Sequence, residues 1–254
     1  REIMSACLAL EHPLSMAFLG PNGTFTQTAA LKHFGHSVKT LPLANIDDVF
    51  REVAAGSVNY GVVPVENSSE GMVSHTLDSF LDSNLHIIGE VELRIHHHLL
   101  VSEGTQVASI SRIYSHQQSL AQCRKWLDTN FPKAERVAVS SNAEAARRIK
   151  GEWHSAAIAG ETAAELYGLT KLHERIEDNP NNTTRFLIIG RESVARSGDD
   201  KSSIIVSVRN NEAGALYSLL EPFYRRGINL TRIESRPSKH DVWTYVFFID
   251  FEGH

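Results

Sequence analysis

Short apolar runs alternate with segments of helical character along most of this chain. Residues 16–19 and 60–65 are apolar runs of strand length, with helix-start and helix-stop residues between them. The same order returns after residue 110, with apolar runs at 113–114, 137–139 and 156–159. Such alternation is typical of strands joined by crossover helices. The pattern predicts an α/β fold with mostly parallel sheets, built in two similar halves.

Helix-start signals stand directly after several of these predicted strands. Thr24–Gln27, Ser115–Gln118 and Ser141–Glu144 each have the spacing of a capping box, in which two side chains bond the free N–H groups of a helix N-terminus. Asn45 is suited to cap a further helix, which Gly56 ends. The sequence therefore predicts several helix N-termini at the carboxyl ends of strands.

The last part of the chain has a different pattern. A polar loop at 177–182 leads into a buried strand at 184–189, and residues 196–202 have the composition of a linker. The remaining residues predict a βαββ order. Its elements are a strand at 204–208, a helix at 214–226 stopped by Gly227, and strands near 228–233 and 243–251.

Composition narrows the class of protein. The chain has 254 residues, enough for about one and a half to two domains, and 42% of them are apolar. The formal charge is −5 and there is no basic block, which argues against nucleic-acid binding. No apolar run reaches the ~18 to 20 residues that span a bilayer, and the opening residues do not resemble a signal peptide. Two cysteines predict free thiols and a cytosolic location.

The candidate chemistry lies at the predicted strand ends. Ligands of open α/β sheets bind there, where helix N-termini present N–H groups suited to anions. Glu66 follows an apolar strand, so we expect desolvation to raise its pKa and let it act as an acid. The alternatives are that Glu66 is a surface or capping residue and that the Ser, Thr and Asn residues at these junctions are caps only.

Other candidate sites receive less support. His96, His97 and His98 are consecutive, but in a strand they alternate between faces and no nearby carboxylate or cysteine completes a metal site. Gly20–Gly23 matches neither of the common phosphate-binding glycine motifs, so nucleotide binding is not indicated. Cys123 lies on an apolar helix face, where we expect a buried, unreactive thiol.

Taken together, the polar clusters resemble those of the prephenate dehydratase family followed by an ACT regulatory domain. The matching motifs are 20–26, 63–71, 114–116 with 122–123, and 182–186. In the tail, 214–216 and 234–237 resemble the two phenylalanine-binding motifs of the ACT domain. The likeness covers about residue 17 to the C-terminus. The helical opening, 1–11, resembles the end of the chorismate mutase domain found in bifunctional members.

The resemblance implies conversion of prephenate to phenylpyruvate, CO₂ and water, without metal or organic cofactor. It also implies two α/β lobes like those of type II periplasmic binding proteins, with the site in the cleft between them. The expected divisions are 1–15 for the upstream tail, 16–198 for the dehydratase (lobes 16–93 with 185–198, and 94–184), and 199–254 for a ferredoxin-like ACT domain. The catalytic residues carried over from the family are Thr184, Glu66, Asn67, Ser115 and Gln122, and those for substrate binding are Thr24, Ser68, His116, Arg185 and Phe186.

The chemistry of the implied reaction assigns roles to some of these residues. A threonine is too weak an acid to protonate a leaving group near neutral pH, so we expect Thr184 to donate a hydrogen bond to the departing hydroxyl, with Glu66 as the proton source. Helix N-termini at Thr24, Ser68 and Ser115 are expected to bind the carboxylates of the dianion.

For the tail, the resemblance implies feedback inhibition by phenylalanine and a homodimer or tetramer. The expected phenylalanine site comprises Gly214, Ala215, Leu216, Asn229, Glu234, Ser235, Arg236 and Pro237. An ACT domain normally has βαββαβ order, and this chain stops after the third strand, so we expect an incomplete domain. Two alternatives remain: an arogenate dehydratase with the same fold, and a two-lobed amino-acid-binding protein without catalysis.

Overall fold

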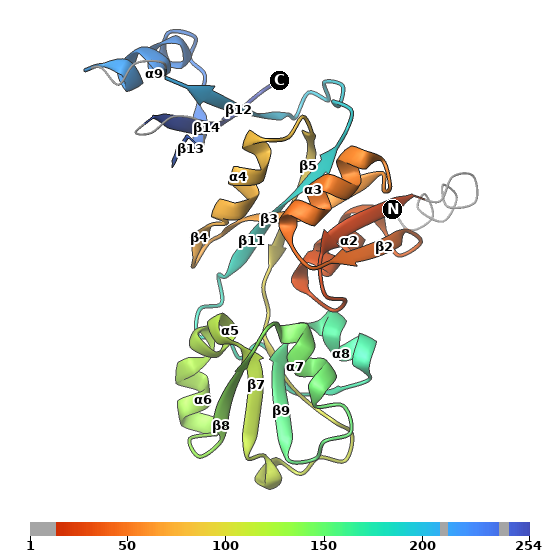
Figure 1. Cartoon of the computed structure of the whole chain (residues 1–254). Helices are drawn as coiled ribbons and strands as arrows, with labels where there is room; N and C mark the ends of the chain where they lie inside the picture. The colour runs from red at the N-terminus through yellow and green to blue at the C-terminus, as the bar shows by residue number, and fades with distance from the viewer. Residues whose placement is uncertain (1–13, 209–212, 239–243) are drawn as a thin grey trace. The chain divides into compact units, whose positions relative to one another are not determined.

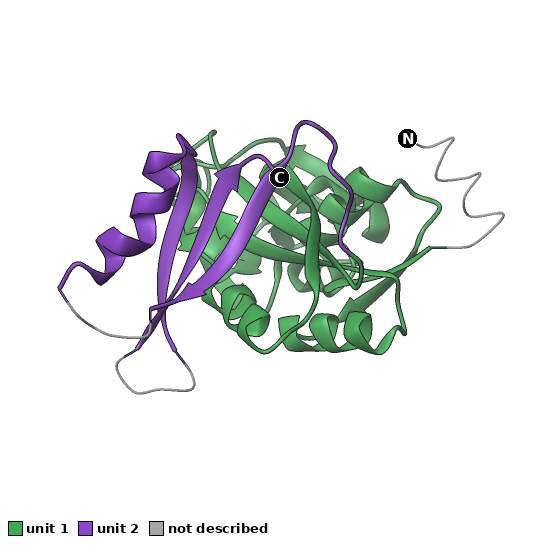
Figure 2. Ribbon diagram, turned by 90° about the horizontal axis from the view of Figure 1, so that it is seen from above, with its two compact units in different colours: residues 1–192 green, residues 193–254 purple. Residues whose placement is uncertain are grey.

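A computed structural model describes residues 14–208, 213–238 and 244–254 of the chain. It divides into two compact units, residues 1–192 (unit 1) and 193–254 (unit 2), coloured separately in Figure 2. The division falls a few residues before the predicted linker. The predicted upstream helix at 1–11 lies outside the described residues.

Unit 1 contains two lobes, each built on one mixed sheet (Figure 1). In the first lobe, residues 14–94 and 183–192, the strand order is β2-β1-β3-β11-β5, with β4 beside β3. The elements are β1 (Ser15–Leu19), α2 (Phe25–Phe34), β2 (Lys39–Leu43), α3 (Ile46–Ala55), β3 (Tyr60–Asn67), β4 (Gly71–Met72), α4 (Ser74–Leu81), β5 (His86–Arg94) and β11 (Thr183–Gly190).

The second lobe, residues 95–182, has the strand order β10-β6-β9-β7-β8. Helices flank this sheet, and the lobe ends in the predicted polar loop. Its elements are β6 (His98–Val101), the short η1 (Val107–Ser109), β7 (Arg112–His116), α5 (Gln117–Gln122), α6 (Arg124–Asn130), β8 (Glu135–Val139), α7 (Asn142–Arg148), β9 (Ser155–Ala159), α8 (Glu161–Tyr167) and β10 (Thr170–His173).

The prediction of mostly parallel sheets is wrong, because both sheets of unit 1 mix parallel and antiparallel pairs. Strands β1, β2 and β3 are parallel, and so are β7, β8 and β9, but β11 is antiparallel to both β3 and β5. Strands β6 and β10 are also antiparallel to their neighbours. The reason is connectivity: β11 carries the chain back from the second lobe and enters the first sheet between two strands that it must run against. This return is the one implied for the Thr184 strand.

Alternating side chains explain why the second sheet is buried on both faces. Leu99, Ile113 and Ile158 pack on one face with Cys123 and Leu127, while their strand neighbours pack on the other. All five residues of β9 are buried, as expected for a central strand covered on both sides. The first lobe has a comparable core. Its buried members are Met16, Phe18, Ala29, Ala30, Val62, Val91, Phe186 and Ile188.

Unit 2 has an antiparallel three-stranded sheet in the order β12-β14-β13 and one helix. Its elements are β12 (Lys201–Ser207), α9 (Ala215–Arg225), β13 (Leu230–Pro237) and β14 (Tyr245–Glu252), which confirms the predicted βαββ order. Among the described helices of the chain, none is both long and apolar enough to cross a membrane.

Candidate active site

A cavity of about 880 Å³ in unit 1 is lined by residues of both lobes. The lining comes from the carboxyl ends of β1, β3 and β7, from the N-terminal parts of α2, α5 and α7, and from the segments around Ile95 and Asn182. Six of the ten predicted site residues of unit 1 line this cavity: Thr24, Asn67, His116, Gln122, Thr184 and Phe186. Of the lining residues that the structure describes, none is Lys or Arg.

The side chain of Asn67, the last residue of β3, connects the backbone that follows β3 with the start of β11. Its Oδ1 accepts hydrogen bonds from the backbone N–H groups of Ser69 (2.9 Å) and Glu70 (3.1 Å). Its Nδ2 donates to Oγ1 of Thr184 (2.7 Å) and to Oδ1 of Asn182 (2.8 Å). Thr184 lies opposite Asn67 in the β3–β11 ladder, so strand register brings the predicted pair together.

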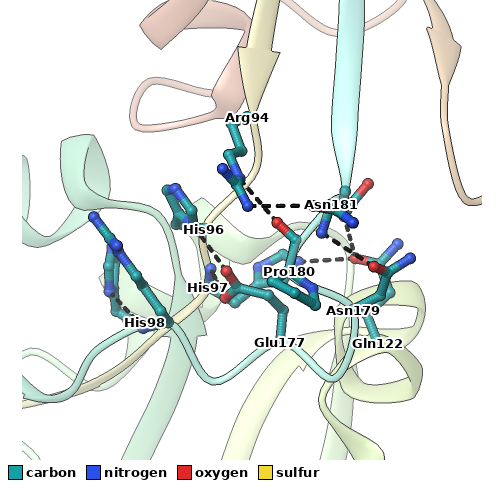
Figure 3. Close-up of polar contacts among 11 residues, drawn as sticks. Arg94, His96, His97, His98, Gln122, Glu177, Asn179, Pro180 and Asn181 are labelled. Carbon is teal, nitrogen blue, oxygen red and sulfur yellow. Dashed lines mark hydrogen bonds and ion pairs between the residues drawn. The ribbon is translucent and has the colours of Figure 1, made fainter.

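The hydrogen-bond chain continues from Asn182 into the second lobe. Nδ2 of Asn182 donates to Oε1 of Gln122 (3.1 Å), and the same oxygen is 2.8 Å from Nε2 of His97. Nε2 of Gln122 donates to Oε1 of Glu70 (3.3 Å), back in the first lobe. Figure 3 shows Gln122 beside His97 at the crossing, the place where residues 94–97 and 177–182 carry the chain between the lobes. One connected network therefore joins both lobes at the cavity.

The crossing itself is fixed by the polar loop that follows β10. The Glu177 carboxylate is 2.7 Å from Nδ1 of His96 and accepts from the backbone N–H of His97 (2.9 Å) (Figure 3). Burial alone would raise the pKa of Glu177, but the hydrogen bonds from His96 and the His97 backbone outweigh it and lower that pKa. On the other side of the crossing, Nε of Arg94 donates to the carbonyl of Pro180 (2.8 Å).

Helix α2 presents its N-terminus to the cavity without a side-chain cap. Thr24 occupies the N-cap position, as predicted, but its hydroxyl donates to the carbonyl of Leu19 (3.3 Å). Gln27 accepts from the N–H of Gly23 (2.6 Å) rather than from that of Thr24, so the predicted capping box is wrong here. The first N–H groups of α2 are consequently left without side-chain partners. Asn45 and Ser141 do cap their helices as predicted.

The lobes approach closely beside this helix N-terminus. Phe25 of α2 packs on Gly160, where an added Cβ would lie 2.7 Å from the phenyl ring. Thr28 and Thr162 are joined by a 2.7 Å hydrogen bond between their hydroxyl groups. Gly160 is required by this close approach, since a larger residue would force α2 away from the second lobe.

The predicted environment of Glu66 is wrong. Glu66 is outside the cavity lining, and its side chain is 38% exposed. It pairs with Arg185 (3.3 Å), which also pairs with Glu90 (2.9 Å), so Arg185 too lies away from the cavity. Successive side chains of a strand point to opposite faces, and β3 and β11 direct Asn67 and Thr184 to the cavity. The residues directly before Asn67 and after Thr184 therefore face the other way.

The predictions for Ser115 and Ser68 also need correction. Ser115 is the buried fourth residue of β7, and the N-cap of α5 is His116. Oγ of Ser115 is 2.8 Å from both Oδ1 of Asn142 and the carbonyl of Ile158, beneath the lining. No described helix begins at Ser68. Its backbone and hydroxyl bond residues of the returning chain, including the N–H of Thr183 (2.9 Å).

Several lining residues were not singled out from the sequence. Asn182 is 2% exposed and central to the network, yet the motif that contains it drew attention only to Thr184, Arg185 and Phe186. A polar residue directly before a buried strand was the available signal. Asn142 bonds the backbone N–H of His116 (3.1 Å) and Oγ of Ser119 (2.8 Å), and nothing in its local sequence separates it from an ordinary first-turn residue.

The remaining candidates are the thiol of Cys123 and a metal site. Cys123 is buried, and this burial, followed by the nearby carboxylates Glu177 and Asp178, raises the pKa of its thiol far above the ordinary value. The prediction of an unreactive thiol is thus supported. Within the described ranges no group of three or more His, Cys, Asp or Glu side chains is arranged to hold a metal ion.

In unit 2 the predicted phenylalanine-site residues lie on two elements. Gly214 is the N-cap of α9 with a φ of 87°, and Ala215 and Leu216 begin the helix. Residues 234–237 form the second half of β13, which Asn229 directly precedes. Leu216 is 44% exposed.

Comparison with known proteins decides the family. The sequence pattern described as prephenate dehydratase matches residues 16–194, most of unit 1. The chain belongs to the prephenate dehydratase family. Its members are carbon–oxygen lyases, so the chain is an enzyme of this class. The pattern of the ACT domain matches residues 202–254.

Relatives agree with this assignment. A bifunctional chorismate mutase/prephenate dehydratase of Pseudomonas aeruginosa is 70% identical over 254 residues, which are all of this chain and 69% of that protein. The crystal structure of a prephenate dehydratase from Arthrobacter aurescens in complex with L-Phe has a TM-score of 0.87 and 37% identity, covering 95% of this chain and 81% of that one.

One further structure shows why the family assignment rests on sequence motifs as well as on fold. GqqA, described as a novel type of quorum quenching acylase, has a TM-score of 0.85 and 30% identity, covering 94% of this chain and 88% of that chain. Proteins of one fold can carry different activities. The reaction therefore depends on the side chains in the cavity.

Proposed function

We propose that the cavity of unit 1 binds prephenate and that Thr184 donates a hydrogen bond to its departing hydroxyl group. In this reaction the bond to the ring carboxylate breaks and releases CO₂. The electron pair enters the ring, the carbon–oxygen bond opposite breaks, and the hydroxide takes up a proton to become water. The observation that carries the proposal is the bond from Asn67 to Thr184 in the cavity. Because Oγ1 of Thr184 accepts there, its own hydrogen is left to donate.

Neutral groups are expected to bind the substrate carboxylates. The uncapped N-terminus of the ten-residue helix α2 offers N–H groups and the positive end of a helix dipole. The absence of Lys and Arg from the described lining fits this role, because a firmly bound cation would stabilise the ring carboxylate that must leave as CO₂. Donors directed at the departing oxygen, in contrast, stabilise charge that develops in the transition state.

The two candidate proton sources differ in their position relative to the cavity. Glu66 lies outside the lining, while Glu70 is the one carboxylate among the lining residues that the structure describes. The carboxylate of Glu70 accepts a hydrogen bond from Gln122. Its backbone N–H donates to Asn67, the residue that orients Thr184. We therefore propose Glu70 in place of Glu66 as the side chain to test for acid assistance.

Product formation separates the candidate activities. Purified chain is incubated with prephenate, and phenylpyruvate is measured by its ultraviolet absorbance; a parallel tube contains arogenate, with phenylalanine as the measured product. Turnover of prephenate is the expected result. Preference for arogenate would assign the alternative dehydratase. Binding of either compound without product would make the chain a binding protein and overturn the proposal.

For unit 2 we propose phenylalanine binding at 214–216 and 234–237, assembly into a homodimer or tetramer, and feedback inhibition. The match to the ACT domain and the exposed apolar side chains of α9 support this. Calorimetric titration with L-phenylalanine tests binding, and light scattering gives the oligomeric state. No heat of binding, or a monomer at all concentrations, would contradict the proposal. The enzyme's place in amino-acid biosynthesis supports the cytosol as its location.

A further inference from the structure

The direction of every hydrogen bond in the network follows from two backbone groups. The N–H groups of Ser69 and Glu70 are obligatory donors, and both point at one end of the Asn67 amide. That end must be the oxygen, so the other end is the NH₂ group, which donates to Asn182 and Thr184. The orientation of Asn67 is thus decided without reference to any other side chain.

The orientation of Asn67 also fixes the side chains across the cleft. Asn182 accepts at its oxygen, so its NH₂ group is the donor toward Gln122. Gln122 consequently presents its oxygen to Asn182, and that oxygen also faces Nε2 of His97 at 2.8 Å. An oxygen that only accepts requires a proton on Nε2. The remaining end of Gln122, its NH₂ group, lies toward Glu70.

We propose that His97 is a positioning residue of this site, acting as the neutral tautomer with its proton on Nε2 to hold the Gln122 amide with its NH₂ group toward Glu70 and the cavity. The proposal deepens the function proposed above and rests on it, in that Gln122 is taken to serve the dehydratase reaction. His97 itself is assigned no contact with the reacting atoms.

The surroundings of His97 fit this tautomer. The residue is 1% exposed, and Phe25 packs edge-on against its ring with centroids 5.6 Å apart. Nδ1 is buried and has no hydrogen-bond partner among the described residues. A proton on Nδ1 would create a buried donor without an acceptor, which is unfavourable, whereas a bare nitrogen is tolerated more easily.

The surroundings of His97 also lower its pKa, which favours a neutral ring. Burial is the main cause that lowers the pKa of His97, and the hydrogen bond to Gln122 and the charge of Glu177 oppose it only in part. The neighbouring histidines, His98 and His96, lower it further. A lowered pKa favours the neutral imidazole at pH 7.

Paired amide substitutions distinguish positioning from simple packing. Glutamine places its terminal NH₂ group near the position of Nε2, whereas asparagine reaches only to that of Nδ1. We expect His97→Gln to keep kcat within roughly threefold, because a neutral donor to Gln122 is retained. We expect His97→Asn to lower kcat about 10²-fold with a smaller change in KM, because the Gln122 oxygen loses one of its two donors and the amide is held less firmly.

A matched pair at the next residue serves as control. His98 is also buried, but it uses Nδ1, which accepts from the N–H of Arg175 (3.3 Å), and it does not line the cavity. His98→Asn should therefore be tolerated better than His98→Gln in melting temperature, the reverse of the order at 97. Equal losses of kcat for His97→Gln and His97→Asn would overturn the proposal.

A measurement on the unaltered chain tests the tautomer without relying on the kinetics of variants or on the substrate. Histidine labelled with ¹⁵N is incorporated into the full chain, and long-range ¹⁵N–¹H spectra are recorded at pH 7, with His97→Gln identifying the His97 signals. The expected pattern is a protonated Nε2 and a bare Nδ1. A proton on Nδ1, or on both nitrogens, would overturn the proposal even if prephenate turnover is confirmed. The expected pattern without turnover would instead count against the proposed function.

Discussion

The two units of this chain differ in how far their own fold covers their functional surfaces. Unit 1 buries polar residues such as His97 and Asn182 at the cavity, and both hydrogen-bond to Gln122 within the unit. In unit 2, helix α9 has no buried residue, and its Tyr217 and Tyr224 are 70% and 86% exposed. The difference teaches that unit 1 contains its polar site within its own fold. Unit 2, in contrast, leaves apolar surface that its own sheet does not cover.

The largest effect is expected at the buried polar site. Replacing Thr184 by valine removes the donor to the departing hydroxyl while preserving shape, so we expect kcat/KM to fall by 10²- to 10⁴-fold, roughly the contribution of acid-type assistance. Steady-state assays with prephenate measure this. Thr183→Val, one residue earlier and outside the lining, is the control with near-normal turnover. Near-normal turnover of a folded Thr184→Val enzyme would show that the polar site is not the catalytic one.

The next largest effect concerns stability of unit 2. Asp250 is 1% exposed and holds Arg232 (2.8 Å) and the hydroxyl of Ser203 (2.6 Å). Arg232→Ala removes the counter-charge that this buried carboxylate holds at 2.8 Å, so we expect unit 2 to lose about 3–5 kcal/mol of unfolding free energy. Arg225→Ala breaks an exposed pair and should cost less than about 1 kcal/mol.

Hydrogen exchange resolves the two units in these variants. We expect Arg232→Ala to lose protection in unit 2 while unit 1 retains its protection and its turnover in the absence of phenylalanine. Simultaneous loss of protection in both units would contradict the view that the fold of unit 1 does not depend on unit 2.

A smaller effect is expected from pH. Burial lowers the pKa of both His97 and His98 in the folded chain, followed for His98 by the charge of Lys171. Below the ordinary value of 6.5 the unfolded chain takes up protons that the folded chain does not. The contribution of these two histidines to the free energy of unfolding is therefore fully present above about pH 6.5. As the pH falls toward the folded pKa of each, that histidine lowers the free energy of unfolding by up to about 1.4 kcal/mol per pH unit.

Urea unfolding at pH 7.5, 6.5 and 5.5 measures this dependence, and His97→Gln should make it shallower. The effect should belong to unit 1, because both histidines with a lowered pKa lie there. Among the described residues of unit 2, His254 is the one histidine. An unchanged slope in His97→Gln would contradict the assignment to His97.

The smallest effect is expected for Glu66→Gln. This side chain is outside the cavity and forms a partly exposed ion pair, so its loss should change stability by less than about 1 kcal/mol and leave the pH–rate profile intact. Glu70→Gln, in the cavity lining, should instead lower kcat and alter the basic limb of the profile. If Glu66→Gln alone abolishes that limb, the original prediction of Glu66 as the acid is restored.

Sequence patterns were sufficient for elements with strong local signals. The strand–helix alternation, the caps at Asn45 and Ser141, and the βαββ order of the tail all depend on neighbouring residues in the chain. The capping box at Ser115 was wrong because the same letters suit a buried strand end, and burial depends on what packs above it. The Thr24 box was wrong because Gln27 can reach either of two adjacent N–H groups.

The sequence by itself determined the family, the two-part organisation and the motif that contains Thr184, because these are carried by residue identity and spacing. Only the tertiary structure decided which motif residues face the cavity. Asn67 and Thr184 do, while Glu66 and Arg185, one position away, lie outside the cavity lining, because adjacent strand residues point to opposite sides. Tertiary structure also joined Asn67, Asn182, Gln122 and His97, since a bond between residues dozens of positions apart depends on strand register and lobe contact.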